Sequence, residues 1–142
     1  MYCSICGSDL NVKEIKNEGA IPYCVSCDKL FFPKVTLAMI SILVNSNNQI
    51  CLVNQRHKKE YKVLLAGFVK PKETLETCVK REIMEEVGIP IYETQYLNSY
   101  YYDGNQVLMV GFIAKTNEFE FTLDKEEIEF ADWYEMDDCL HR

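Results

Sequence analysis

Residues 67–89 read GFVKPKETLETCVKREIMEEVGI, and the rest of this 142-residue chain is best interpreted outward from them. Between residues 75 and 87 the apolar side chains recur at helical spacing, which predicts a helix with one face that packs on a sheet. Thr74 is a suitable N-cap, and Gly88 stands where a helix end favours a left-handed residue. The stretch therefore predicts one amphipathic helix with defined ends.

The predicted helix carries three acids on one patch of its surface. Glu82, Glu85 and Glu86 stand at i, i+3 and i+4, so their carboxylates are neighbours and repel one another. A cation between them would relieve this repulsion, and hard oxygen ligands suit Mg²⁺ or Mn²⁺. The alternative is a solvated acidic helix face without a ligand.

The same stretch fits the complete pattern G-x5-E-x7-R-E-U-x-E-E-x-G-U, in which U is apolar. Every fixed position is filled, by Gly67, Glu73, Arg81, Glu82, Ile83, Glu85, Glu86, Gly88 and Ile89. This pattern is the Nudix box, and the chain resembles a Nudix hydrolase. The resemblance implies an α/β fold, the Nudix α/β/α sandwich with a mixed sheet. It also implies cleavage of a nucleoside diphosphate linked to another moiety.

Composition narrows the class of protein. Apolar residues make up 48% of the chain, enough for a core, while the formal charge is −7 and the pI about 4.9. This acidity argues against broad binding to nucleic acid or to anionic membranes. No apolar stretch reaches the ~20 residues of a membrane span, and the N-terminus lacks the pattern of a signal peptide. We expect a cytoplasmic protein that does not bind membranes.

Residues 1–34 contain two C-x2-C knuckles with 17 residues between them. Paired thiolates at this spacing can close a tetrahedral Zn²⁺ shell, which predicts a small zinc ribbon. The four ligands would be Cys3, Cys6, Cys24 and Cys27. A redox dithiol or two disulfides are the alternatives, although seven cysteines without a signal fit a reduced compartment better. We expect the zinc to be structural, and the ribbon to have a structural or dimerising role.

Residues 35–142 then form the Nudix domain. The patterns of apolar and turn residues predict strands at 35–44, 50–54, 63–66, 96–102, 107–115, 119–123 and 131–134, a turn at 103–105, an acidic loop or helical turn at 124–129, and a last helix from Met136 onward. Residues 55–62 are predicted to be a polar, basic loop. Within it, Arg56 is a candidate contact for a phosphate or a base, and the alternative is a solvated loop.

A zinc ribbon directly before a Nudix domain is similar to the NADH pyrophosphatase family, and the resemblance covers essentially the whole chain. The chain departs from that family's array S-Q-P-W-P-F-P-x-S, because at the corresponding place only Ser99 is retained. Tyr100 and Tyr102 stand in this region and are candidates for stacking on a base or a nicotinamide. The alternative is that these tyrosines are ordinary strand residues.

The Nudix resemblance also implies a metal site. Glu82 and Glu86 would ligate Mg²⁺ or Mn²⁺, and Glu85 with the carbonyl of Gly67 would complete the site. Arg81 would orient an acid of the motif and not the substrate.

Glu127 matches a further acidic position of the family. It is a candidate metal ligand or general base, in competition with Glu86 for the latter role. The alternative for Glu127 is a surface acid beside Glu126 and Glu129.

Three hypotheses on function follow. The first is a metal-dependent pyrophosphohydrolase for NADH, NAD or ADP-ribose type dinucleotides, working as a homodimer as the family resemblance implies. The second keeps this chemistry but makes the substrate an NAD-capped RNA 5′ end. The third is a non-catalytic module that senses nucleotides or associates with nucleic acid.

Overall fold

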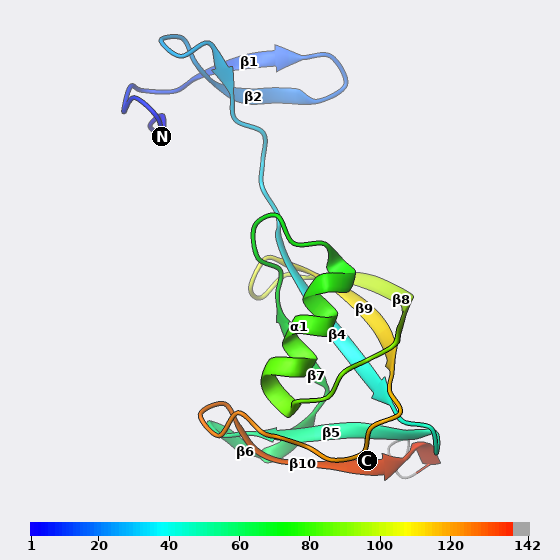
Figure 1. Ribbon diagram of the computed structural model, residues 1–142. Helices are drawn as coiled ribbons and strands as arrows, with labels where there is room; N and C mark the ends of the chain where they lie inside the picture. Colours follow the sequence, from blue (N-terminus) through cyan, green and yellow to red (C-terminus); the bar gives the residue numbers. More distant parts are fainter. Residues whose placement is uncertain (138–142) are drawn as a thin grey trace. The chain divides into compact units, whose positions relative to one another are not determined.

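The computed structural model describes residues 1–137, and of Lys59 only the backbone. The chain divides into two compact units, Met1–Val35 and Thr36–Arg142; Figure 1 shows the elements of each. None of the helices described is both long and apolar enough to cross a membrane.

The first unit is a small antiparallel sheet. Its strands are β1 (Asn11–Ile15), β2 (Gly19–Cys24) and β3 (Lys29–Leu30), in the order β1-β2-β3. Within this unit the buried side chains are Cys3, Ile21 and Cys24. Three buried side chains are too few to stabilise a unit of this size. The fold of this unit therefore needs a cross-link or a bound metal.

The second unit is one mixed sheet with one described helix (Figure 1). Strand order is β10-β5-β4-β9-β8, while β6 pairs with β5 and β7 pairs with β4. β4 and β9 run parallel, and the other pairs are antiparallel. The elements are β4 (Thr36–Val44), β5 (Gln49–Gln55), β6 (Lys58–Val63), β7 (Leu65–Phe68), α1 (Leu75–Val87), β8 (Glu93–Tyr102), β9 (Val107–Lys115) and β10 (Ile128–Glu135).

Helix α1 has the ends that its sequence predicts. The hydroxyl of Thr74 accepts a hydrogen bond from the backbone N–H of Thr77 at 3.1 Å. Gly88 has φ +71°, and its N–H donates to the carbonyl of Met84 at 3.0 Å. A Cβ at Gly88 would lie 2.8 Å from the backbone oxygen of Thr122, so glycine is needed here for both conformation and space.

The apolar face of α1 closes the core of the second unit. Val79, Ile83 and Val87 are fully buried, and the helix contacts β4, β7 and β10. Burial of such side chains stabilises a fold by roughly 1.5–3 kcal/mol each. The opposite, polar face of the helix is thereby fixed in orientation, and with it the acids of the box.

Two predictions about the second unit are wrong. The stretch predicted as a polar loop at 55–62 contains strand β6, which turns back on β5 with Gln55 opposite Lys58. The sequence at 58–62 shows no alternation of apolar and polar residues, and Val63 at the end of the strand packs against the core.

The second wrong prediction is the strand at 119–123, where the structure has no regular element. The backbone groups there bond elsewhere. The N–H of Thr122 donates to the carbonyl of Val87 at 2.8 Å, and the indole N–H of Trp133 donates to the carbonyl of Phe119 at 2.9 Å. The segment is therefore a loop fastened to the end of α1 and to β10.

The predicted last helix falls at the edge of what the structure describes. Met136 and Asp137 are helical, and the remainder of the prediction, with Cys139, lies outside the described residues.

Candidate active site

The outer side of the acidic helix is organised by one arginine. Arg81 donates to both carboxylate oxygens of Glu73, from Nε at 2.6 Å and from Nη2 at 2.9 Å. Its Nη2 also donates to the carbonyl of Phe68 at 3.1 Å. The Arg81 guanidinium, together with the backbone N–H of Lys70, lowers the pKa of Glu73 to about 2. This clamp ties the loop before α1 to the helix itself.

Arg81 also meets two of the three neighbouring acids. Its Nη1 lies 2.8 Å from Glu82 Oε1 and 3.2 Å from Glu85 Oε2. The Glu85 side chain is half exposed, whereas that of Glu82 is largely covered. Arg81 therefore offsets the charge on the outer part of the acidic patch, and Glu85 is directed away from the interior.

Gly67 on β7 leaves room for the Glu82 carboxylate. A Cβ at Gly67 would lie 2.5 Å from each carboxylate oxygen of Glu82, closer than any real contact permits. The backbone conformation of Gly67 is ordinary, so the need for glycine here is one of space. A carboxylate is thus held directly against an unobstructed strand backbone.

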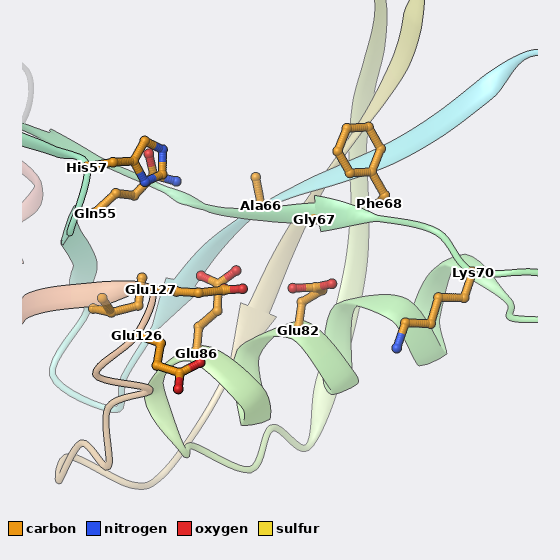
Figure 2. Close-up of a pocket in the computed structure, with 11 residues that line it drawn as sticks. Gln55, His57, Ala66, Gly67, Phe68, Lys70, Glu82, Glu86, Glu126 and Glu127 are labelled. Carbon is orange, nitrogen blue, oxygen red and sulfur yellow. The ribbon is translucent and has the colours of Figure 1, made fainter.

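Glu86 faces the interior of the site. It is only 7% exposed, and burial together with the nearby Glu82, Glu127 and Glu85 carboxylates raises its pKa to about 8. Figure 2 shows Glu82 and Glu86 on α1, and Glu127 from the loop before β10, with their carboxylates directed into the space beneath β7. Among the described residues neither Glu86 nor Glu127 forms an ion pair, so no basic side chain compensates these two acids.

These acids line a cavity of about 430 Å³. Its walls are formed by Gln55, His57, Ala66, Gly67, Phe68, Lys70, Glu82, Glu86, Glu126, Glu127 and Ile128. The sequence alone does not indicate Lys70, Phe68 or Gln55 as residues of the site. Phe68 directly follows Gly67 in the box and Lys70 stands three residues after it, and this closeness in sequence is the available signal.

A second cavity, of about 240 Å³, adjoins the first. It shares Gln55, Ala66, Gly67 and Phe68 with the first cavity and is otherwise lined by Ala38, Tyr102, Asn105, Val107 and Met109. An acidic hollow and a mainly apolar hollow therefore meet at strand β7.

The structure brings some predicted site residues together and leaves others apart. Glu82, Glu86, Glu127, Gly67 and Tyr102 line the two cavities. Glu85, Arg81, Arg56 and Tyr100 are not among the lining residues. Tyr100 is half exposed on β8, and the Arg56 guanidinium contacts Glu129 and the carbonyl of Lys125.

The donor set fits a divalent cation. Several carboxylates share one cavity, one of them is buried with a raised pKa, and an unobstructed glycine backbone lies beside them. Oxygen donors alone suit Mg²⁺ or Mn²⁺ and do not suit a soft metal. The like charges also give a physical reason for cation binding, since a divalent ion would relieve their repulsion.

The four cysteines of the first unit form a separate cluster. Their sulfur atoms all lie within 4.8 Å of one another, with Cys6 and Cys24 at 3.5 Å and Cys3 and Cys27 at 4.0 Å. A tetrahedral zinc site with bonds of about 2.3 Å has sulfurs about 3.8 Å apart. Backbone N–H groups of Ile5 and Cys27 donate to Cys3 and Cys24, at 3.3 and 3.4 Å. The cluster therefore suits zinc in size and in ligand type.

Fold and cavity together define an α/β protein with a carboxylate-rich, metal-binding type of site on one helix. The chain belongs to the NUDIX domain family, because the sequence pattern of that family matches residues 34–142.

Sequence relatives narrow the similarity further. The chain is 34% identical over 137 residues to the NAD-capped RNA hydrolase NudC of Klebsiella pneumoniae, covering 96% of this chain and 52% of that protein. The Escherichia coli protein of the same name is 33% identical with the same coverage. The chain thus spans about half the length of the curated relatives it matches.

Solved structures agree on the fold. The NUDIX hydrolase of Nitrosomonas europaea superimposes with a TM-score of 0.67 at 20% sequence identity. The superposition covers 96% of this chain and 78% of the chain of that hydrolase. The NUDIX domain of Shewanella oneidensis NrtR, solved with ADP-ribose, superimposes with a TM-score of 0.65 at 16% sequence identity. That superposition covers 84% of this chain and 82% of the NrtR chain. At this identity the likeness establishes the Nudix fold, which the sequence predicts.

Proposed function

We propose that this protein is a divalent-metal-dependent pyrophosphohydrolase. The observation that carries the proposal is the buried Glu86, held beside Glu82 and Glu127 without a compensating cation among the described residues. An uncompensated group of this kind costs stability, which a solvated surface patch would not. A bound divalent metal ion would offset the repulsion among these carboxylates, and the metal could in turn bind a polyphosphate.

The cluster would hold Mg²⁺ or Mn²⁺ through Glu82, Glu86 and Glu127, with the Gly67 carbonyl as a further oxygen. The metal, when bound, would neutralise phosphate charge and lower the pKa of a water molecule. Arg81 and Glu85 would support the site from the outside, because Arg81 forms ion pairs with both Glu82 and Glu85 on the helix surface.

In the reaction, the oxygen of a water molecule attacks one phosphorus of the anhydride. A new P–O bond forms, the bridging P–O bond breaks, and its electron pair leaves on the other phosphate. The proton of the water passes to a carboxylate, for which Glu86 and Glu127 are the two candidates. The products are two phosphomonoesters, which for NADH are reduced nicotinamide mononucleotide and AMP.

The two adjoining cavities suit a substrate with an anionic centre and a planar ring. Phosphates would occupy the acidic cavity with the metal, and a base or nicotinamide would occupy the cavity lined by Phe68, Tyr102 and Met109. The NAD in the names of the sequence relatives and the ADP-ribose of the NrtR domain favour substrates of the NAD or ADP-ribose type, and the family resemblance adds NADH. NAD-capped RNA is the second candidate, favoured by the relatives alone.

The zinc ribbon is proposed as a structural unit with one Zn²⁺ held by its four cysteines. A homodimer, which the family resemblance implies, and a cytoplasmic location, which the sequence predicts, both stay predictions.

A substrate panel tests the proposal. Zinc-loaded protein is incubated with NADH, NAD, ADP-ribose and a short NAD-capped RNA, each with Mg²⁺ and with Mn²⁺, and products are resolved by chromatography. We expect phosphomonoester products that require the metal and disappear in Glu86→Gln. Tight nucleotide binding without turnover of any substrate would instead support the sensing module.

A further inference from the structure

Glu127 reaches the acidic cavity from a loop and not from a regular element. No helix or strand is described between Lys115 and Ile128. The end of this loop bonds to itself, since the N–H groups of Glu127 and Ile128 both donate to the carbonyl of Asp124, at 3.0 and 2.8 Å. The N–H of Asp124 in turn donates to the carbonyl of Glu86 at 3.0 Å. One side of the turn is therefore fastened to α1.

Arg56 fastens the other side of the same turn. Its backbone N–H donates to the carbonyl of Glu127 at 2.8 Å, and its Nε donates to the carbonyl of Lys125 at 2.5 Å. Its Nη1 lies 2.8 Å from Oε2 of Glu129. One arginine thus contacts the residues two before and two after Glu127, and Glu127 itself.

The guanidinium is oriented toward the loop and not toward the cavity. The neighbours Gln55 and His57 line the cavity, whereas Arg56 does not. A planar guanidinium with several fixed N–H groups can join a carbonyl and a carboxylate at once, which a lysine ammonium does less well.

We propose that Arg56 is a positioning residue that holds the Glu127 carboxylate against Glu86 and Glu82. Its role in turnover rests on the proposed function, whereas its role in holding the loop does not. The side chains of the ion pair are 45% and 38% exposed, so the pair contributes little to global stability. Its effect is local, and a displacement of about 1 Å at a reacting group can cost ~10²-fold in rate.

A double-mutant cycle in turnover separates positioning from substrate binding. In the wild-type background, Arg56→Ala should lower kcat by about 10- to 100-fold and change KM by less than about 3-fold. In the Glu127→Gln background, Arg56→Ala should lower kcat by less than about 3-fold, because the group that it positions is already lost. Lys58→Ala is the matched control, since it removes a charge from an exposed residue of the same hairpin. Arg56→Lys should recover only part of the loss.

Equal losses in both backgrounds would overturn the proposal, because Arg56 would then act independently of Glu127. A rise in KM with kcat unchanged would also overturn it and would restore Arg56 as a contact for the substrate.

Hydrogen exchange of the metal-free protein gives a measurement that needs no substrate. Arg56→Ala should speed exchange at the amides of Glu127 and Ile128 by about 10-fold or more, while Lys58→Ala leaves them unchanged. Unchanged exchange in Arg56→Ala would overturn the proposal even in an active enzyme. Conversely, faster exchange in a protein with no turnover would support the anchoring by Arg56 and would count against the proposed function alone.

Discussion

Replacing Glu86 by glutamine should stabilise the metal-free protein while abolishing its activity. Burial and three neighbouring carboxylates raise the pKa of Glu86 from 4.5 to about 8. The folded protein therefore prefers the protonated form more strongly than the unfolded chain does. Below pH 4.5 both states are protonated and there is no penalty. As pH rises from 4.5 to 8 stability is lost, and above pH 8 the penalty is complete.

The magnitude follows from the size of this rise. At about 1.4 kcal/mol for each pH unit, charging Glu86 in the fold costs at most roughly 5 kcal/mol. Water in the cavity screens part of this, so we expect Glu86→Gln to gain about 2–3 kcal/mol at pH 8.5 without Mg²⁺ or Mn²⁺. The gain should fall toward zero near pH 4.5.

Urea unfolding followed by tryptophan fluorescence measures this quantity. Trp133 is the single tryptophan and stacks on Phe121 in the second unit, so its signal reports the unit that holds the acids. Glu76→Gln is the matched control, because Glu76 is exposed on the same helix and does not line the cavity. It should shift stability by less than about 0.5 kcal/mol.

The metal provides the opposing half of the experiment. Saturating Mg²⁺ should stabilise the wild-type protein at pH 8.5, and it should stabilise Glu86→Gln far less. Turnover of a cleaved dinucleotide should fall by about 10³-fold or more. Equal stability of variant and wild type without metal would refute the assignment of a buried, repelled carboxylate. Equal stabilisation by Mg²⁺ would refute Glu86 as a ligand.

Three further predictions concern other parts of the protein. Gly67→Ala should weaken Mn²⁺ binding by about 10-fold or more, because the Glu82 carboxylate must swing away from the new Cβ. The same variant should lose less than about 1 kcal/mol in the free energy of unfolding. Gly88→Ala is the control: its positive φ should cost about 1–2 kcal/mol of stability, while its Mn²⁺ affinity changes little. Arg81→Lys should lower kcat by roughly 10- to 100-fold with a smaller change in KM, since one ammonium cannot hold the bidentate clamp; normal kcat would show that the clamp is dispensable. Cys24→Ser should reduce bound zinc below one equivalent and remove the dispersed NMR signals of the first unit, and full zinc content would rule out the four-thiolate site.

The features that the sequence predicts well are local ones. The helix bounds at residues 75–87 follow from a cap, an apolar period and a glycine, all within one short stretch. The acids Glu82 and Glu86 follow from the same stretch, because helical spacing alone places them together.

The features that it predicts poorly depend on contacts far along the chain. Strand β6 lacks apolar alternation and pairs with the end of β5, which β4 leaves unpaired because β4 and β5 pair only at Val44 and Ile50. The segment at 119–123 has the composition of a strand, but its backbone groups bond to α1 and to Trp133 instead. Arg56 is a candidate contact for a substrate because it is basic, and only the fold shows that the turn at Lys125 lies within reach of its guanidinium.

The arrangement of charge on α1 explains how Arg81 can lie beside the acidic cluster without occupying the place of a metal ion. Arg81 contacts Glu73, Glu82 and Glu85, and these contacts lie on the outer side of the acidic patch. It therefore stabilises the fold of the box without neutralising Glu86 on the inner side. If Arg81 reached Glu86, the pKa of that carboxylate would fall and the repulsion that favours a divalent ion would be lost. Glu85 thus belongs to the ion-pair network of Arg81, Glu86 belongs to the cavity, and Glu82 takes part in both, which leaves Glu86 without a basic partner and open to a divalent cation.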